Sequence, residues 1–195
     1  MKKLLITGFD PFNGESVNPS WEAVKALPAV VGDYALYKLE LPTVYAAGPR
    51  KAMEAAEAMR PDAILAVGQA GGRKAITPEV IGINLREASI TDNAGVLLSG
   101  VPIAPEGPAA YFSTLPVREM VKAVAALGIP AALSYSAGAF VCNDVLYSLL
   151  HRFHGTGIRV GFIHVPFLPE QVKNGEFSLP KETIIQALCA AIETI

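Results

Sequence analysis

Runs of apolar residues alternate along the chain with segments in which apolar residues recur every three or four positions. Unbroken apolar runs are typical of buried strands, and the longer spacing is typical of amphipathic helices. Strands are predicted over residues 3–9, 34–41, 63–67, 79–85, 131–135 and 158–164. Helices are predicted in five places: after the cap Asn18, from the cap Thr43 to about Arg60, over residues 116–127, after Cys142, and over residues 179–195. Residues 86–112 are predicted to form a long irregular segment.

This alternation of strands and helices predicts an α/β fold, with an open, mostly parallel twisted sheet and helices on both of its faces. The continuous apolar run over residues 63–67 is typical of a strand that is covered on both sides. A chain of 195 residues that is 51% hydrophobic can bury a full core. It contains no internal repeat and no low-complexity linker, so a single domain over residues 1–195 is expected.

The composition limits which binding partners and which cellular compartment are expected. A formal net charge of -2 gives no electrostatic reason to bind nucleic acid or an anionic membrane. The start, MKKLLITGF, is too short an apolar run for a signal peptide, and no window approaches the roughly 18 apolar residues of a membrane span. Two cysteines are too few for a disulfide framework, so a reducing cytoplasm is expected. Cys189, on the apolar side of the last helix, is predicted to pack in the core.

Candidate chemistry lies where strands end. In an open α/β sheet the ligand binds beyond the carboxyl ends of the strands, so the residues that follow each strand deserve most weight. They include Phe9, Phe12, Gln69, Cys142 and His164. A thiol, an imidazole, an amide and two aromatic rings are the components of a small site for covalent catalysis. Each of these side chains also has a structural alternative, because all of them occur in ordinary cores.

Cys142 stands where the small-residue turn 136–139 leads into a helix. The unpaired N–H groups and the dipole of a helix start stabilise an anion, so we expect this thiol to ionise more easily than a free cysteine. The alternative is a small buried apolar residue. Ser136 is a competing nucleophile, in a segment that half resembles the G-x-S-x-G elbow. Since the predicted helix begins after Phe140, we interpret Ser136 as a turn residue.

His164 interrupts an apolar strand at its carboxyl end, on the edge where the thiol is also expected. Its alternative is a hydrogen-bonded core histidine. His151 and His154 lie near the end of a predicted helix, where the dipole favours cations. No second cysteine or histidine has the spacing of a metal ligand. The glycine-rich loop 68–74 lacks both phosphate-binding spacings, and it favours a turn that lets the backbone approach a ligand.

Six stretches together carry a family resemblance. They are TGFDPF at residues 7–12, VGQAGGR at 67–73, ITPE at 76–79, TDN at 91–93, SYSAGAFVCN at 134–143 and HVPFLPEQ at 164–171. In this order they resemble pyroglutamyl peptidase I, also called pyrrolidone-carboxylate peptidase, from the first strand to the last helix. The resemblance implies a phosphorylase/hydrolase-like fold and a cysteine peptidase that removes N-terminal pyroglutamate from peptides.

The resemblance also implies roles for single residues. The family's Glu-Cys-His triad matches Glu79, Cys142 and His164, although Glu79 taken alone is an ordinary acidic residue after a proline. Its pyroglutamate pocket matches four residues, which are Phe9, Phe12, Gln69 and Phe140. Family members need no metal or other cofactor, are cytoplasmic and often form tetramers. The resemblance therefore implies a cytoplasmic homo-oligomer, a tetramer built as a dimer of dimers.

Two departures from the family pattern affect the expected activity. The family arginine near the nucleophile is Ser89 in this chain, and Arg86 is a candidate to reach the same place. Asn13 stands where glycine is usual. An alternative hypothesis is therefore a subunit that binds pyroglutamyl groups, or serves in assembly, with little or no turnover. The segment 94–112, rich in proline and glycine, is a candidate contact surface or lid.

Overall fold

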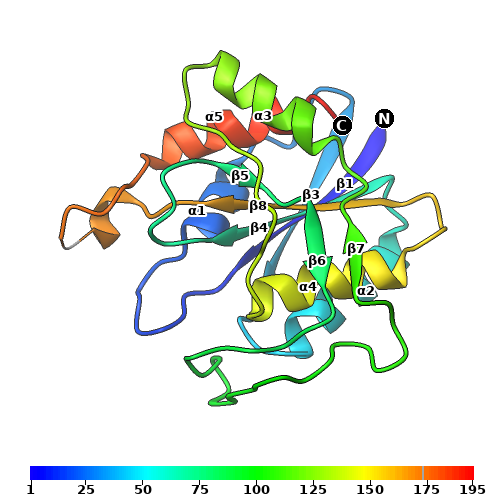
Figure 1. Cartoon of the computed structure of the whole chain (residues 1–195). Helices are drawn as coiled ribbons and strands as arrows, with labels where there is room; N and C mark the ends of the chain where they lie inside the picture. The colour runs from blue at the N-terminus through cyan, green and yellow to red at the C-terminus, as the bar shows by residue number, and fades with distance from the viewer. Residues whose placement is uncertain (173) are drawn as a thin grey trace.

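The computed structural model describes residues 1–172 and 174–195, and Figure 1 shows them as a sheet flanked by helices. Six strands form the main sheet, in the order β2-β3-β1-β4-β8-β5. These strands are β1 (Lys2–Phe9), β2 (Val30–Val31), β3 (Tyr34–Leu41), β4 (Ala63–Gln69), β5 (Thr77–Pro78) and β8 (Arg159–Val165). The helices are α1 (Pro19–Ala26), α2 (Ala47–Met59), α3 (Val117–Ala126), α4 (Val141–Arg152), α5 (Lys181–Ile192) and the short 3-10 helix η1 (Pro169–Gln171). A separate two-stranded sheet pairs β6 (Ile81–Ile83) with β7 (Ala110–Phe112).

The centre of the main sheet is parallel. β1 pairs in parallel with both β3 and β4, and β4 pairs in parallel with β8. Only the short edge strands β2 and β5 are antiparallel. From its third residue onward β1 is buried without a break, as is the run 63–68 in β4, because helices cover both faces. The predicted single α/β domain with a mostly parallel sheet therefore matches the fold.

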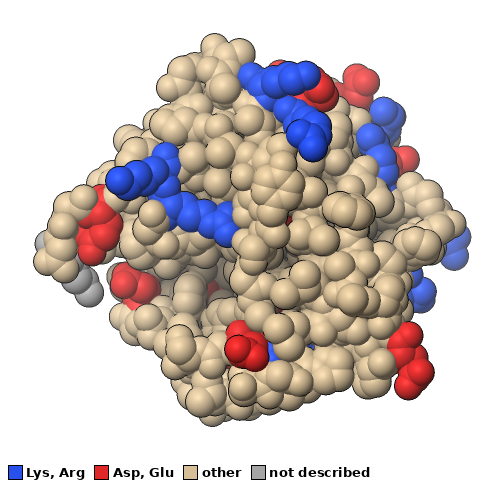
Figure 2. Space-filling view, viewed as in Figure 1, with Lys and Arg blue, Asp and Glu red and all other residues tan. Residues whose placement is uncertain are grey.

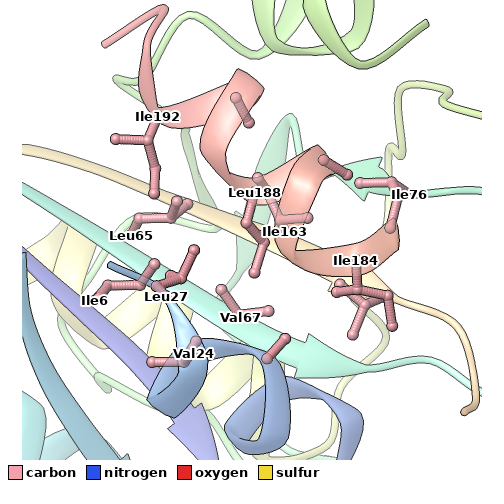
Figure 3. Close-up of a cluster of buried hydrophobic side chains, with 14 of the residues drawn as sticks. Ile6, Val24, Leu27, Leu65, Val67, Ile76, Ile163, Ile184, Leu188 and Ile192 are labelled. Carbon is pink, nitrogen blue, oxygen red and sulfur yellow. The ribbon is translucent and has the colours of Figure 1, made fainter. Parts of the chain in front are cut away.

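Each face of the sheet carries its own core. One core packs α1, α3 and α5 against the sheet, and Figure 3 shows Ile184 and Leu188 of α5 beside Ile163 of β8. The other core packs α2 and α4 against the opposite face, where Phe162 takes part. Because side chains alternate along a strand, His164 shares the face of Phe162 and lies on the side of α4.

Many local predictions agree with the structure. Asn18 caps α1 through its side chain, which accepts a hydrogen bond from the N–H of Ser20. Gly128 follows α3 with a φ of 74°, as expected of a residue that ends a helix in the left-handed region. Cys189 packs, partly buried, against the core under α5, and neither it nor Cys142 forms a disulfide. Within the described residues, no helix has the length and apolarity needed to cross a membrane.

The predicted strand over residues 131–135 is wrong. This segment makes only isolated bridges, with Ile76 and Glu79, and Tyr135 at its end is 64% exposed. The N–H groups of Ala132 and Ser134 donate to the segment that carries β5, but the return bond at Pro78 is missing since proline has no N–H. The pairing therefore never becomes a continuous ladder.

Two other boundaries differ from the prediction. Thr43 does not cap α2: its hydroxyl donates to the carbonyl of Asp10, and the helix begins at Ala47 after Ala46, which has a φ of 58°. The strand predicted over residues 79–85 is replaced by two short strands, β5 before it and β6 within it. The irregular region 86–112 ends in β7, which pairs with β6 across a long loop. That pairing is non-local, so hydrophobic spacing did not indicate it.

The first turn of α4 is fastened to its surroundings by two buried side chains. The amide of Asn143 accepts from the N–H of Ile83 at 2.9 Å and donates to the carbonyls of Ile83 and Leu85 at 2.9 and 3.0 Å. The carboxylate of Asp144 accepts from the N–H of Ala46 and from Arg86 Nη2, both at 2.9 Å. These bonds join α2, β6 and the loop after it to the start of α4.

We predict that Asp144→Ala strongly destabilises the fold. Asp144 is fully buried and Arg86 is 17% exposed, so removing the carboxylate leaves a guanidinium and a backbone N–H without their partner. Breaking such a buried ion pair costs about 3–5 kcal/mol of unfolding free energy, which urea denaturation measures. The matched control is Glu57→Ala, which breaks the exposed pair of Glu57 with Arg152 and should cost about 1 kcal/mol or less. Equal losses in the two variants would contradict the prediction.

Candidate active site

Three elements bring the predicted triad to one edge of the sheet. Glu79 follows β5, His164 lies near the end of β8, and Cys142 is the second residue of α4. The antiparallel register of β5 and β8 sets Thr77 opposite His164, which brings Glu79 alongside the imidazole. His164 Nδ1 lies 2.6 Å from Oε1 of Glu79, and both side chains are almost wholly buried. The sequence-predicted partnership of these two residues is therefore present.

The sulfur of Cys142 lies over the backbone of β4. Gly68 is the residue of β4 in register with His164, and a Cβ placed on it would stand 2.8 Å from the sulfur and 2.7 Å from the ring of Phe162. The Phe162 ring is in turn 4.7 Å from the His164 ring, measured between centroids. The thiol and the imidazole thus occupy the same face and the same edge of the sheet. Any side chain larger than hydrogen at residue 68 would compete with the sulfur for this space.

Arg73 is a component of the site to which the sequence assigned no role. Its Nη1 donates to Oε1 of Glu79 and to Oγ1 of Thr77, each at 2.6 Å, and its Nη2 donates to the carbonyl of Ser136 at 2.9 Å. Burial raises the pKa of the Glu79 carboxyl, but the hydrogen bond to His164 and the charge of Arg73 lower that pKa below its ordinary value on balance. Glu79 is therefore ionised at neutral pH.

The thiol and the imidazole are both neutral at rest. Burial and, to a smaller extent, the charge of Glu79 raise the pKa of the Cys142 thiol to about 12, against a smaller lowering by Arg73. Burial also lowers the pKa of His164 and outweighs its hydrogen bond to Glu79. The expectation that the helix start makes this thiol ionise easily is wrong, because desolvation of the sulfur is the larger effect. With Glu79 ionised, the hydrogen bond assigns the imidazole proton to Nδ1, so Nε2 can accept a proton.

Aromatic side chains lie next to this cluster. Phe12 and Phe140 are half-buried, with ring centroids 6.0 Å apart and planes inclined by 42°. The ring of Tyr45 meets the edge of Phe140 at 5.4 Å. Phe9 differs from the other two predicted pocket phenylalanines, since it is only 2% exposed and packs against Phe162 at 6.3 Å. Phe9 therefore supports the floor of the site from within the core.

Gln69 ends β4 and is held by a second glutamine. Oε1 of Gln69 accepts a hydrogen bond from Nε2 of Gln171 at 3.1 Å, and Oε1 of Gln171 accepts from the N–H of Leu168 at 3.0 Å. Gln171 is a residue that sequence reasoning left without a role. Both glutamines lie in the motifs that carry the family resemblance, but the contact joins residues 102 positions apart, so spacing alone could not reveal it.

Arg86 lies against a different side of α4 from Cys142. It binds Asp144, which is two residues beyond Cys142 and therefore about 200° around the helix. Ser89, at the position of the family arginine, is exposed. Arg86 belongs to the junction of α2 and α4, whereas Arg73 contacts the Glu79 carboxylate.

The surface around the cluster is open on the side of Arg73. A hollow of about 450 Å³ is lined by Arg73, Thr77, Leu133, Ser134, Tyr135 and Ser136. Figure 2 shows a hollow on this face of the molecule, with Lys and Arg side chains along its upper side and Asp or Glu side chains to its left and below it. A cavity of about 360 Å³ near Arg159 lies at the opposite end of β8 from His164 and does not touch the triad. Among the described residues, no group of three or more His, Cys, Asp or Glu side chains is arranged to hold a metal ion.

Comparison with known proteins places this geometry in one family. The family model described as pyroglutamyl peptidase matches residues 2–195. The chain is 49% identical to the pyrrolidone-carboxylate peptidase of Enterococcus faecalis, over 98% of this chain and 92% of that protein. The crystal structure of pyroglutamyl peptidase I from Bacillus amyloliquefaciens superposes with a TM-score of 0.96 at 47% identity, covering 100% of this chain and 96% of that one. A mutant pyrrolidone carboxyl peptidase from Pyrococcus furiosus superposes with a TM-score of 0.94 at 38% identity, covering 98% and 97% of the two chains. The chain belongs to the pyroglutamyl peptidase family.

Proposed function

We propose that this protein is a cysteine peptidase that hydrolyses the bond after an N-terminal pyroglutamate residue. Cys142 is the nucleophile, His164 the general base and acid, and Glu79 the residue that orients the imidazole. The observation that carries this proposal is the 2.6 Å contact of His164 with a buried carboxylate, on the sheet edge where the Cys142 sulfur packs. Family membership supports the same assignment.

The reaction proceeds in two halves. The sulfur of Cys142 attacks the carbonyl carbon of pyroglutamate, while Nε2 of His164 takes the thiol proton and then gives it to the leaving amine. Water then attacks the thioester, with His164 as base, and releases pyroglutamate. No side chain caps the start of α4, so the N–H groups of its first turn can stabilise the oxyanion.

The desolvation of the partly buried Cys142 sulfur determines when the nucleophile forms. Because the pKa of Cys142 is about 12, the free enzyme holds a thiol and not a stable thiolate. Proton transfer to His164 therefore accompanies attack on the substrate. The charge that then develops on the imidazolium faces the Glu79 carboxylate at 2.6 Å, which stabilises it.

The surrounding side chains suit an uncharged lactam. A flat ring between two parallel aromatic faces needs about 7 Å, twice the van der Waals contact distance. At 6.0 Å and 42°, Phe12 and Phe140 form an inclined wall instead, against which one face of the lactam lies. The amide of Gln69, held by Gln171, offers polar groups to the lactam edge. A free N-terminal ammonium would be excluded, because burying it without a partner is costly.

We predict that Cys142→Ala abolishes hydrolysis of a chromogenic pyroglutamyl amide, with a loss of kcat/KM of at least about 10³-fold. Cys189→Ala is the matched control, because Cys189 packs under α5 on the other face of the sheet, and it should keep full activity. Alkylation of the wild type should inactivate it through Cys142.

Activity that survives in Cys142→Ala but disappears in Ser136→Ala would instead assign the reaction to a serine hydrolase. A wild type that binds pyroglutamyl peptides without turnover would support the alternative of a binding subunit.

The pH dependence of kcat/KM follows from the imidazole. Only neutral His164 can accept the thiol proton, so activity falls as the pH drops through the pKa of His164. Burial lowers that pKa from its ordinary value of 6.5, so we predict an acid limb below pH 6.5 and full activity above it. Rates measured from about pH 4 to pH 9 give the position of the limb. A limb centred above pH 6.5 would contradict a buried, neutral imidazole.

We also propose that the protein is a cytoplasmic homo-oligomer, a tetramer built as a dimer of dimers. Two free cysteines fit a reducing compartment. Phe112, on the short strand β7, is 70% exposed, and an exposed aromatic side chain of this size suits a subunit contact. Light scattering coupled to gel filtration should give four times the mass of one chain. The mass of a single chain would contradict the oligomer.

A further inference from the structure

Arg73 lies where three parts of the site meet. It belongs to the loop after β4, it contacts Glu79 and Thr77 beside β8, and it reaches the carbonyl of Ser136 in the segment that leads to α4. Its side chain is 27% exposed, so one side faces the hollow that Tyr135 also lines.

The guanidinium of Arg73 and the imidazole of His164 donate to the same carboxylate oxygen of Glu79. Oε1 of Glu79 receives Arg73 Nη1 and His164 Nδ1, each at 2.6 Å, so the arginine fixes the position of the oxygen that orients the histidine. The planar fork makes this possible, because two nitrogens of one group point in set directions toward Glu79 and Ser136. A lysine has one nitrogen and could not hold both partners in the same way.

We propose that Arg73 is a positioning residue of the peptidase reaction, which holds the Glu79 carboxylate against His164 and ties that pair to the backbone that leads into Cys142. The inference rests on the proposed function, since it concerns the same triad. It adds a fourth side chain, which acts through Glu79 and does not touch the substrate.

The charge of Arg73 gives this role a measurable effect on the pH dependence of the reaction. The titratable groups around it are Glu79 after β5, His164 on β8, Cys142 on α4 and Tyr135 at the hollow. A cation favours the carboxylate and the thiolate and disfavours the imidazolium, so Arg73 lowers the pKa of Glu79, Cys142 and His164. Its removal should raise all three pKa values. The acid limb of kcat/KM should therefore move to higher pH.

The test compares Arg73→Met and Arg73→Lys with the wild type on a pyroglutamyl amide. We expect Arg73→Met to lower kcat about 10–100-fold with little change in KM, and to move the acid limb upward by up to about one pH unit. Arg73→Lys should lose part of kcat and keep the limb near its wild-type position, because the charge remains. Arg50→Met is the control, since Arg50 is a 70% exposed arginine on α2, and it should change neither quantity.

A second measurement does not depend on turnover. Iodoacetamide reacts with the thiolate, and mass spectrometry of the peptides separates Cys142 from Cys189. At equal pH, Cys142 should be alkylated more slowly in Arg73→Met than in the wild type and Arg73→Lys. An unmoved acid limb together with unchanged alkylation in Arg73→Met would overturn the proposal and leave Arg73 a purely structural residue. A wild type that fails to hydrolyse the substrate would refute the proposed function, and the alkylation rates would still decide the part played by Arg73.

Discussion

The hydrogen bond between His164 and the ionised carboxylate of Glu79 is the interaction on which the site depends. A buried carboxylate is tolerated only when charged and polar partners compensate for its lost hydration. Here the imidazole and Arg73 both reach the same oxygen at 2.6 Å. The carboxylate fixes the tautomer of the imidazole and leaves Nε2 on the side of the ring away from Glu79. Without that orientation, a neutral histidine on the same sheet edge as a neutral thiol would have no defined direction for proton transfer.

The sheet supplies the geometry that this interaction needs. β5 runs antiparallel to β8 and delivers Glu79, whereas β4 runs parallel to β8 and places Gly68 beside His164. The absence of a side chain at Gly68 leaves room for the Cys142 sulfur, which arrives on the first turn of α4. Asn143 and Asp144 fasten that turn to β6 and α2. The partly buried Cys142 thiol gives up easy ionisation, and in the proposed mechanism proton transfer to His164 replaces it.

How far the sequence predicts the structure depends on whether the signal is local. The cap Asn18, the stop Gly128 and the buried run of β4 act through adjacent residues, so spacing and residue type predict them. The family motifs indicated Glu79, which on its own has no distinguishing pattern. Pairings between distant segments were missed, including β6 with β7 and Gln69 with Gln171. The contact of Arg73 with Glu79 was also missed, because the turn that folds residues 73–79 back on themselves leaves no periodic signal. The easily ionised thiol was wrongly predicted because the sequence shows a helix start but not the desolvation of the sulfur, which is the larger effect on its pKa.

The departure at Ser89 leaves the proposed triad of Glu79, Cys142 and His164 intact. Arg86 stabilises the far side of α4, so the positive charge next to the triad carboxylate comes from Arg73. The central claim is that the free enzyme holds a neutral Cys142 thiol beside a neutral His164. Thiolate absorbs in the ultraviolet, so a pH titration of the difference spectrum between wild type and Cys142→Ala measures this state directly. The account predicts no thiolate signal from Cys142 at neutral pH and its appearance only in strong alkali. A full thiolate signal at neutral pH would contradict it.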